Sequence, residues 1–297
     1  MNITILGPGA IGSLYAYRLN QAGHSVSLWG RHPASPVEFS LDECPVLSFA
    51  NRDRHCLQHC DLLIVTLKAW QVEAALSPIL EMLHQDTIIL FLHNGMGTVE
   101  RLQAQLHNRP VLLGTTTHGA LRVTANEIRH TGQGQTLIGA WNPLGQQCQF
   151  VAEVLDHAIA PVKWHEDIRS ALWTKLIINC AINPLTATLD CQNGQLVHSQ
   201  YRSQLSAIVS EAAMCARTQT IELDDKALLQ TVLTVAKATE ENYSSMHQDI
   251  YNKRQSEIDF ITGYVLDIAQ KYQLAVPQNA ALFQQIKQIE ASWSQHD

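Results

Sequence analysis

The sequence predicts an α/β protein in which an N-terminal domain of alternating strands and helices precedes an all-helical C-terminal domain. Three observations carry this prediction. Apolar runs of strand length alternate with helical patterns up to about residue 160, a glycine-rich turn joins the first strand to the first helix, and only helical patterns follow Asp167. At 297 residues the chain is long enough for two domains that each bury a core. We place the boundary so that residues 1–167 form the first domain and residues 168–297 the second.

The composition excludes several classes of protein. Hydrophobic residues make up 46% of the chain, charged residues 16%, and the net charge is −7, which is ordinary for a soluble enzyme and offers no basic patch to nucleic acid. No apolar run approaches the length of a membrane span. The first residues already resemble a strand, without a charged lead-in or cleavage site, which predicts a cytoplasmic location. The seven cysteines are scattered, and we expect them to be free thiols.

A glycine-rich turn follows the first expected strand. We expect strands at Asn2–Leu6 and Ser25–Trp29 with a helix at Ala10–Gln21 between them. The turn reads Gly7-Pro8-Gly9-Ala10-Ile11-Gly12. In this context the GxGxxG pattern indicates a Rossmann-type dinucleotide site, because the glycines let backbone approach a pyrophosphate and the helix N-terminus attracts its charge. The alternative is a glycine-rich turn that binds no ligand.

The end of the second strand indicates which nicotinamide cofactor this site accepts. An NAD site carries Asp or Glu here to bind the ribose hydroxyls. This strand instead ends in Leu28-Trp29-Gly30-Arg31-His32, without an acid. Arg31 suits the 2′-phosphate of NADP, with His32 assisting, so we predict NADPH/NADP+ as the cofactor. The alternative is an ordinary exposed loop arginine.

Two polar residues follow later strands of the first domain. We expect strands at Val46–Phe49, Leu62–Thr66, Thr87–Leu92 and Val111–Thr117, with antiparallel additions at Glu127–His130 and Thr136–Gly139. Lys68 opens the helix after the second of these strands, and Asn94 follows the third. Ligands of parallel sheets bind at the carboxyl ends of the strands, so both residues are candidates for one site.

A cluster of histidines and cysteines raises the question of a metal site. His55, Cys56, His59 and Cys60 have side chains that suit zinc. On a helix, however, the two pairs form stripes about 100° apart, and no further ligand pair follows at a typical distance. We predict an ordinary surface helix and no metal.

In the second domain, the stretch Ala171–Thr188 sets a polar stripe into an apolar helix. Lys175, Asn179 and Asn183 are spaced four residues apart and share one slowly rotating face. Such groups are costly to bury unless something polar faces them. Periodicity leaves two interpretations open, the wet edge of an amphipathic helix or the wall of a substrate pocket. We expect Pro184 to bend the helix and help aim Asn183.

The remaining helices include one with a distinctive start. Helical patterns occupy residues 199–218, 225–241 and 279–291, and a further helix is expected at Phe260–Tyr272. Ser256 and Asp259 resemble a capping box, which places Glu257 in the first helical turn. A carboxylate there is explained by capping alone or by a role in the site.

Eight motifs in order give the chain a resemblance to a known family. They read GPGAIG, LKAWQ, HNGMG, GTTTHGA, LWTKLIINCAINPLTA, NGQL, SSMHQDI and SEIDFITG, and the resemblance extends from residue 3 to about residue 263. The chain resembles the ketopantoate reductases (2-dehydropantoate 2-reductases). The resemblance implies an N-terminal Rossmann NADP-binding domain, a helical domain of 6-phosphogluconate-dehydrogenase-like C-terminal architecture, and a site in the cleft between them. It also implies reduction of 2-dehydropantoate by NADPH to (R)-pantoate, towards pantothenate and coenzyme A.

The resemblance further implies roles for single residues. Lys175 is implied to be the catalytic proton donor. Asn94, Asn179, Asn183, Asn193 and Ser245 are implied to hold the substrate. Gly7, Pro8, Gly9, Ala10, Ile11, Gly12, Arg31, Lys68, Asn94, Ala120 and Glu257 are implied to line the cofactor site. Two positions depart from the family pattern, since Thr262 stands in place of an Asn and Lys253 in place of a Gly.

These residue types suit the implied reaction. An ammonium stabilises the oxygen that gains charge when a ketone receives a hydride, and then protonates it. Amides and a hydroxyl suit a small substrate that carries a carboxylate, a ketone and a hydroxyl. Two alternatives remain: a reductase or dehydrogenase for another 2-keto acid, and an NADP(H)-binding sensor without turnover. We expect a monomer or homodimer.

Overall fold

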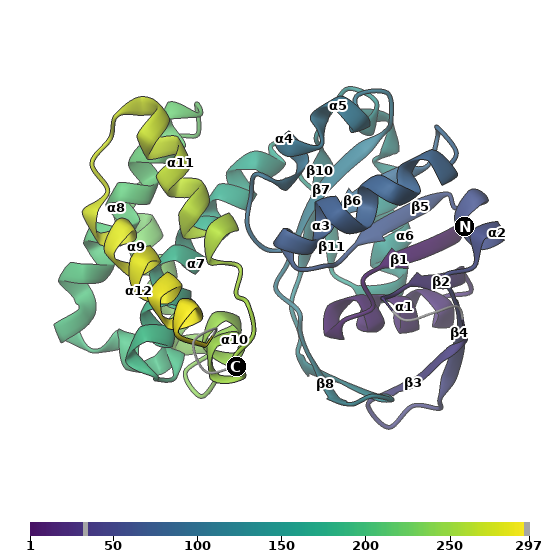
Figure 1. The fold of residues 1–297 in the computed structure, drawn as a ribbon, viewed down its shortest axis with the longest axis horizontal. Coiled ribbons are helices and arrows are strands. Elements are labelled where there is room, and N and C mark those ends of the chain that lie inside the picture. Colours follow the sequence, from purple (N-terminus) through teal and green to yellow (C-terminus); the bar gives the residue numbers. More distant parts are fainter. Residues whose placement is uncertain (32–34, 294–297) are drawn as a thin grey trace. The chain divides into compact units, whose positions relative to one another are not determined.

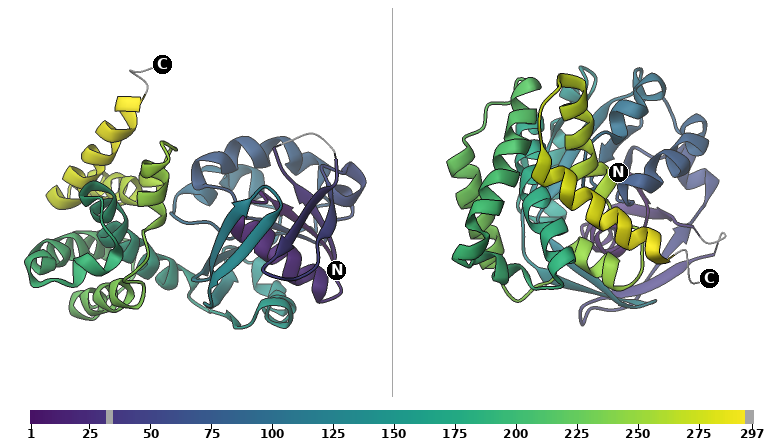
Figure 2. Two further views of the ribbon diagram at one scale, coloured as in Figure 1. Left: turned by 90° about the horizontal axis from the view of Figure 1, so that it is seen from below. Right: turned by 60° about the vertical axis from the view of Figure 1, so that its left-hand side comes forward.

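The computed structural model describes residues 1–31 and 35–293 (Figure 1). The chain divides into two compact units. The first comprises Met1–His93 and Thr98–Ile168, and the second comprises Asn94–Gly97 and the described residues from Arg169 onward. Both units are also drawn in Figure 2, and each is described here by itself.

An 11-stranded sheet organises the first unit, in the order β11-β10-β7-β6-β5-β1-β2-β4-β3-β9-β8 (Figure 1). The strands are β1 (Asn2–Leu6), β2 (Ser25–Trp29), β3 (Val37–Leu41), β4 (Leu47–Asn51), β5 (Leu62–Val65), β6 (Ile88–Phe91), β7 (Val111–Thr116), β8 (Gly119–Thr124), β9 (Glu127–Gly132), β10 (Thr136–Ala140) and β11 (Val162–Trp164). From β2 through β1, β5 and β6 to β7 the strands run parallel. All residues of β5 and β6 are buried, as expected for parallel strands covered on both faces. The carboxyl ends of these strands therefore share one edge of the sheet.

Helices of the first unit pack on this sheet. They are α1 (Ala10–Gln21), α2 (Arg54–Gln58), α3 (Ala69–Leu76), η1 (Ser77–Met82), α4 (Thr98–Arg101), α5 (Gln103–Leu106), η2 (Gly145–Cys148) and α6 (Phe150–Ile159). The α1 helix contacts α6 and the hairpin of β8 and β9. Its Tyr15 is fully buried and shares a 2.6 Å hydrogen bond with Thr136 of β10. These contacts fix the helix that begins at the glycine-rich turn.

The second unit is helical and is built around one long helix, α7 (Ile168–Leu189). The other helices are η3 (Asn193–Val197), η4 (Ser199–Tyr201), α8 (Arg202–Thr218), α9 (Asp225–Ala238), α10 (Ser245–Tyr251), η5 (Ile258–Phe260), α11 (Thr262–Tyr272) and α12 (Pro277–Trp293). Across the described parts of the chain, no helix has both the length and the apolar character needed to cross a membrane.

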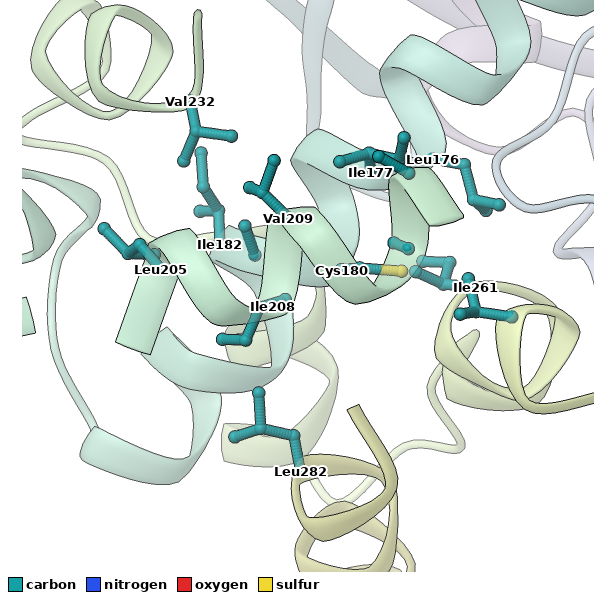
Figure 3. Close-up of a cluster of buried hydrophobic side chains, with 14 of the residues drawn as sticks. Leu176, Ile177, Cys180, Ile182, Leu205, Ile208, Val209, Val232, Ile261 and Leu282 are labelled. Carbon is teal, nitrogen blue, oxygen red and sulfur yellow. The ribbon is translucent and has the colours of Figure 1, made fainter. Parts of the chain in front are cut away.

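The core of the helical unit draws side chains from several helices (Figure 3). Leu176, Ile177 and Cys180 of α7 are buried beside Ile208 of α8 and Leu282 of α12. Because these apolar residues recur on one side of α7, that side is fully committed to the core. The polar stripe of α7 occupies other positions of the same helix.

The sequence analysis missed several elements. It did not predict β3, β8, β11 or α6, and it placed the strand near residue 46 slightly too early. The expected edge strands exist, but they lie far apart in the sheet: β10 pairs antiparallel with β7, whereas β9 pairs antiparallel with β8 and parallel with β3. The β8 strand shows no regular alternation of buried and exposed residues, and none of its residues is buried.

The predicted capping box at Ser256 is half right. The Ser256 hydroxyl accepts a 3.3 Å hydrogen bond from the backbone N–H of Ile258. Asp259 does not return the bond, because its carboxylate accepts from Lys287 at 2.9 Å, and the Ser256 N–H donates to Glu290 instead. The chain then forms the short η5 before α11 begins at Thr262, two residues later than predicted.

The start of α12 depends on a carboxylate from α8. Glu211 accepts hydrogen bonds from the backbone N–H groups of Gln278 and Asn279 and from the side-chain amide of Asn279, at 2.9, 2.9 and 2.8 Å. Asn279 is completely buried. Glu211 thus satisfies helix N-terminal donors that would otherwise lose their partner.

We predict that Glu211→Ala lowers the free energy of unfolding by about 2 kcal/mol, because it leaves buried donors unsatisfied. Urea denaturation followed by circular dichroism measures the change. The matched control is Glu240→Ala, which removes an exposed ion pair with Lys237 and should cost about 0.5 kcal/mol or less. Equal losses in the two variants would contradict the capping role of Glu211.

Candidate functional site

The glycine-rich turn is shaped for an anion at the start of α1. Gly7 has a φ of +91°, and a Cβ there would lie 2.5 Å from the Leu67 side chain. A Cβ on Gly12 would lie 2.4 Å from the Thr66 hydroxyl, so α1 approaches the end of β5 closely. A Cβ on Gly9 would meet nothing within 4 Å, and no side chain caps the helix there. Open space in front of uncapped helix N–H groups suits a phosphate.

An arginine that the sequence analysis did not single out holds this turn in place. Arg122 of β8 donates to the carbonyl oxygen of Pro8 at 2.7 Å and to the Ser13 hydroxyl at 2.9 Å. It also donates to the carbonyl oxygen of Ala125 at 2.7 Å, which ties the guanidinium to its own hairpin. Arg122 therefore joins the turn between β1 and α1 to a strand more than 100 residues further along the chain.

The end of β2 carries the predicted 2′-phosphate residue. Arg31 is exposed, as is required of a residue that meets a ligand. The preceding Gly30 donates its N–H to the Asn51 side chain at 2.9 Å, which fixes the backbone between β2 and β4. A Cβ on Gly30 would lie 3.3 Å from the Pro8 ring, so this segment adjoins the glycine-rich turn. His32, the predicted helper, lies outside the described residues.

The two other cofactor candidates of the first unit occupy strand and helix ends. Lys68 is half-buried at the N-terminus of α3, and its backbone N–H donates to the side chain of Gln71 at 3.3 Å. It follows β5, so it belongs to the same sheet edge as the glycine-rich turn. Ala120 is half-buried in β8, opposite His130 and beside a register shift. It is two residues from Arg122.

In the helical unit, the structure brings Lys175, Glu257 and Asn94 together. The Asn94 amide donates to a Glu257 carboxylate oxygen at 3.5 Å, the long end of the hydrogen-bond range. Glu257 is only 4% exposed. Burial lowers the pKa of Lys175 from 10.5 to about 8, and the negative charge of Glu257 opposes this change. A lysine held next to a carboxylate and an amide in this way is suited to proton transfer near neutral pH.

The segment after β6 completes this cluster. Asn94–Gly97 belongs to the helical unit, where the N–H of Met96 donates to the carbonyl oxygen of Phe260 at 2.8 Å. A Cβ on Gly95 would lie 2.7 Å from that oxygen, and Gly95 has a φ of +80°. The close approach explains why glycine follows Asn94. It also fixes the position of Asn94 against the start of η5, where Glu257 lies.

The polar stripe of α7 is only partly exposed to solvent. Lys175 and Asn179 are half-buried, and Asn183 is buried. The α7 helix continues through Pro184 to Leu189 as one helix, so the expected aiming of Asn183 stays a prediction. The Thr186 hydroxyl lies 2.8 Å from the carbonyl oxygen of Ile182 and 3.1 Å from that of Asn183, within the same helix as Pro184.

The two other substrate candidates lie near the end of this helix. The Asn193 amide donates to Thr239 at 2.9 Å, its N–H donates to the Asn242 carbonyl oxygen, and its side-chain oxygen is buried without a partner among the described residues. Ser245 is exposed at the first position of α10. Its neighbour Ser244 is bonded to Thr186 of α7 at 2.8 Å, so the N-terminus of α10 is anchored to the stripe-bearing helix.

Thr262 and Lys253, the two residues that depart from the family pattern, lie in different surroundings. Thr262 is completely buried beside Cys180, and its hydroxyl has no partner that meets hydrogen-bond geometry among the described residues. Burial raises the pKa of Cys180 to about 12, which keeps this thiol protonated. Lys253 has a φ of +52°, so the loop keeps a left-handed backbone that a glycine would adopt at lower cost.

The cysteine and histidine cluster of α2 shows no metal geometry. His55 and His59 stack with ring centroids 4.2 Å apart, and the Asp53 side chain caps the helix. Within the described ranges, no group of three or more His, Cys, Asp or Glu side chains is arranged to hold a metal ion. Every cysteine is a free thiol.

We predict that Arg122→Met weakens dinucleotide binding about tenfold, because the longer-range bonds to Pro8 and Ser13 disappear while the side-chain volume is nearly kept. Fluorescence titration with NADPH measures the dissociation constant. The control is Arg129→Met on the same hairpin, where the arginine makes an exposed ion pair with Glu127. A dissociation constant that stays at the wild-type value in Arg122→Met would rule out the positioning role.

Comparisons with known proteins identify the family of the chain. The family model "Ketopantoate reductase PanE/ApbA" matches residues 3–143, and "Ketopantoate reductase PanE/ApbA C terminal" matches residues 167–290. The chain is 50% identical over 294 residues to a 2-dehydropantoate 2-reductase of Vibrio cholerae, covering 99% of each chain. It is 40% identical over 297 residues to that of Escherichia coli, covering 99% of this chain and 96% of that one.

A solved structure shows the same fold at lower identity. D-mandelate dehydrogenase with NADH and anilino(oxo)acetate has a TM-score of 0.90 and 24% identity, covering 98% of this chain and 99% of that one. The two family models together span nearly the whole chain, in the order of its two units. On this basis the chain belongs to the ketopantoate reductase family.

Proposed function

We propose that this chain is a 2-dehydropantoate 2-reductase that uses NADPH to reduce the ketone of 2-dehydropantoate to (R)-pantoate, for pantothenate and coenzyme A synthesis. The observation that carries the proposal is a half-buried lysine, Lys175, beside Glu257 and Asn94 on a helix that also bears Asn179 and Asn183. Full-length relatives that carry the name of this enzyme support the substrate.

The chain offers a site that fits NADPH. The open space before Gly9 and the uncapped start of α1 suit the pyrophosphate, and Arg31 suits the 2′-phosphate. Lys68 and Ala120 would add to the lining within the first unit, and Asn94 and Glu257 of the second unit are the further cofactor residues that the family resemblance implies. When bound, the nicotinamide supplies the hydride that reduces the ketone carbon.

Lys175 acts on the oxygen of that ketone. Its Nζ carries the proton, stabilises the growing negative charge on the oxygen, and then protonates it. A pKa of about 8 keeps the ammonium mostly protonated at neutral pH while making it a better acid than an exposed lysine. The negative charge of Glu257 stabilises the positive charge on Lys175, and Asn94 in turn orients Glu257.

The remaining polar residues bind and orient the substrate. Asn179 and Asn183 present amides on the same helix as Lys175, so their spacing from the proton donor is rigid. Asn193 and Ser245 would add an amide and a hydroxyl. Amides both donate and accept hydrogen bonds, which suits a substrate that has a carboxylate and a hydroxyl on either side of its ketone.

The cytoplasm is the proposed location, and the substrate is the proposed small-molecule partner of a monomer or homodimer. All seven cysteines are free thiols, which agrees with a reducing compartment. The alternative enzyme is a dehydrogenase for another 2-keto acid. This alternative is compatible with the fold, because D-mandelate dehydrogenase shares it.

One assay separates these possibilities. The absorbance of NADPH is followed with the purified chain in separate reactions, which contain 2-dehydropantoate, pyruvate, 2-ketoisovalerate or phenylglyoxylate. We expect the value of kcat/KM to be highest for 2-dehydropantoate by at least about tenfold, since its hydroxyl gives the site an added hydrogen bond. A preference for phenylglyoxylate would replace the proposed substrate, and tight NADPH binding without any oxidation would indicate a sensor.

We predict that Lys175→Met reduces kcat by about a thousandfold or more, because it removes both the proton donor and the charge that stabilises the oxygen. NADPH affinity, measured by titration without substrate, should change little. The variant should also lose the rise in stability that the wild type shows between about pH 8 and 10.5. The penalty of burying the ammonium is fully present below the folded pKa of about 8, and it disappears as the pH rises towards 10.5. Near-normal turnover would remove Lys175 from the mechanism.

We predict a falling limb in the pH profile of reduction near the pKa of Lys175, about 8. The rate should fall above that pH because the lysine loses the proton that it donates. In Glu257→Gln the limb should move to lower pH, because the charge that raises the lysine pKa is gone. The measurement is kcat/KM from pH 6 to 10 for both proteins. A limb at the same pH in both would show that Glu257 does not act on Lys175.

A further inference from the structure

A second arginine lies beside Arg31 at the predicted 2′-phosphate site. Arg52 directly follows β4, and its backbone N–H donates to the carbonyl oxygen of Leu28 in β2 at 2.9 Å. Its guanidinium donates to the carbonyl oxygen of Arg31 at 3.3 Å. The same guanidinium lies 5.6 Å from the ring centroid of Trp29, as a cation–π contact. Backbone and side chain both hold Arg52 against the end of β2.

This arginine belongs to the edge of the sheet that carries the glycine-rich turn. The residue before it, Asn51, accepts the N–H of Gly30, and Gly30 lies in contact range of the Pro8 ring. Contacts therefore connect Arg52 through Asn51 and Gly30 to the glycine-rich turn, which is suited to a pyrophosphate. All of these residues lie within the first unit.

We propose that Arg52 is a second specificity-determining residue, which joins Arg31 in binding the 2′-phosphate of NADPH. This inference rests on the proposed use of NADPH. A phosphate monoester carries nearly two negative charges at neutral pH, and guanidinium groups match its geometry better than any other side chain. A guanidinium has five N–H donors, so one bond to the Arg31 carbonyl oxygen does not exhaust Arg52.

The neighbouring acid, Asp53, is hydrogen-bonded to the helix that follows it. Asp53 directs one carboxylate oxygen to the N–H groups of His55 and Cys56, at 2.8 and 3.2 Å, where it caps α2. The carboxylate is thus engaged by a helix N-terminus. Around the end of β2, Arg31 and Arg52 supply the cationic groups.

The backbone of Arg52 offers a clean way to test its side chain. Its φ is +54°, the left-handed region that glycine adopts easily and an arginine rarely occupies. Arg52→Gly therefore removes the side chain without straining the backbone, and the melting temperature should not fall because of the backbone. The matched control is Arg54→Ala, which removes an exposed arginine two residues further on, at the first position of α2.

The experiment measures binding by isothermal titration calorimetry in the absence of substrate. The probes are NADPH, NADH, adenosine 2′,5′-bisphosphate and ADP, and the proteins are the wild type, Arg31→Ala, Arg52→Gly and Arg54→Ala. For Arg52→Gly we expect the dissociation constants of NADPH and the bisphosphate to rise about tenfold or more, with NADH and ADP changing less than about twofold. Arg54→Ala should behave as the wild type. The loss in Arg52→Gly should shrink at high salt, because charge carries the interaction.

Three results would overturn the proposal. An unchanged NADPH affinity in Arg52→Gly would show that Arg52 does not touch the phosphate. An equal loss for NADPH and NADH would assign Arg52 to the adenine or to the shape of the loop. An equal loss of NADPH affinity in Arg54→Ala would show that the net charge of the protein, and not a contact of Arg52, causes the effect. A chain that binds NADPH as expected but fails to reduce 2-dehydropantoate would refute the proposed function and leave Arg52 in its role.

Discussion

The burial of one ammonium group is the constraint on which the helical unit depends. Lys175 lies on a helix whose other side chains form the core, so water that would solvate its charge is largely excluded. Glu257 offsets part of this cost with an opposite charge, and Asn94 holds Glu257. The position of Asn94 depends in turn on the close approach of Gly95 to Phe260. Each of these features bears on the charge of the half-buried lysine, which is the proposed proton donor.

Different sides of the α7 helix therefore form part of the core and carry the polar stripe. Leu176, Ile177 and Cys180 fill the core (Figure 3), and the high pKa of the Cys180 thiol keeps that side free of charge. The stripe that carries Lys175 and Asn179 stays polar and half-buried. Because both sets sit on one helix of 22 residues, a shift of the stripe would disturb the core. Packing thus supplies the rigidity that the polar groups need.

Features that depend on neighbouring residues could be predicted from the sequence, whereas features that depend on contacts between distant residues could not. The turn from Gly7 to Gly12 and the elements around it follow from local patterns, and the structure confirms β1, α1 and β2 as predicted. The β8 strand alternates apolar and polar residues from Leu121 to Thr124, but none of its residues is buried, and β3 pairs with β9 far along the chain. Arg122 gains its meaning only when the hairpin reaches Pro8, so no local pattern could identify it. The grouping of Asn94 with Glu257 was equally non-local, and the family resemblance alone suggested it.

The division of labour between the units has a consequence for cofactor choice. In the first unit the turn suited to a pyrophosphate presents backbone groups, which are insensitive to side-chain identity, while the groups suited to a 2′-phosphate stand at strand ends after β2 and β4. The D-mandelate dehydrogenase described with NADH shares this fold, so the fold itself does not choose between the two nicotinamide cofactors. The choice must lie in side chains that the core does not need. Arg31 and Arg52 are exposed, and a change at either leaves the buried strands and the lysine of α7 untouched. With the proposed roles of Arg31 and Arg52, cofactor preference in this chain is separable from its chemistry.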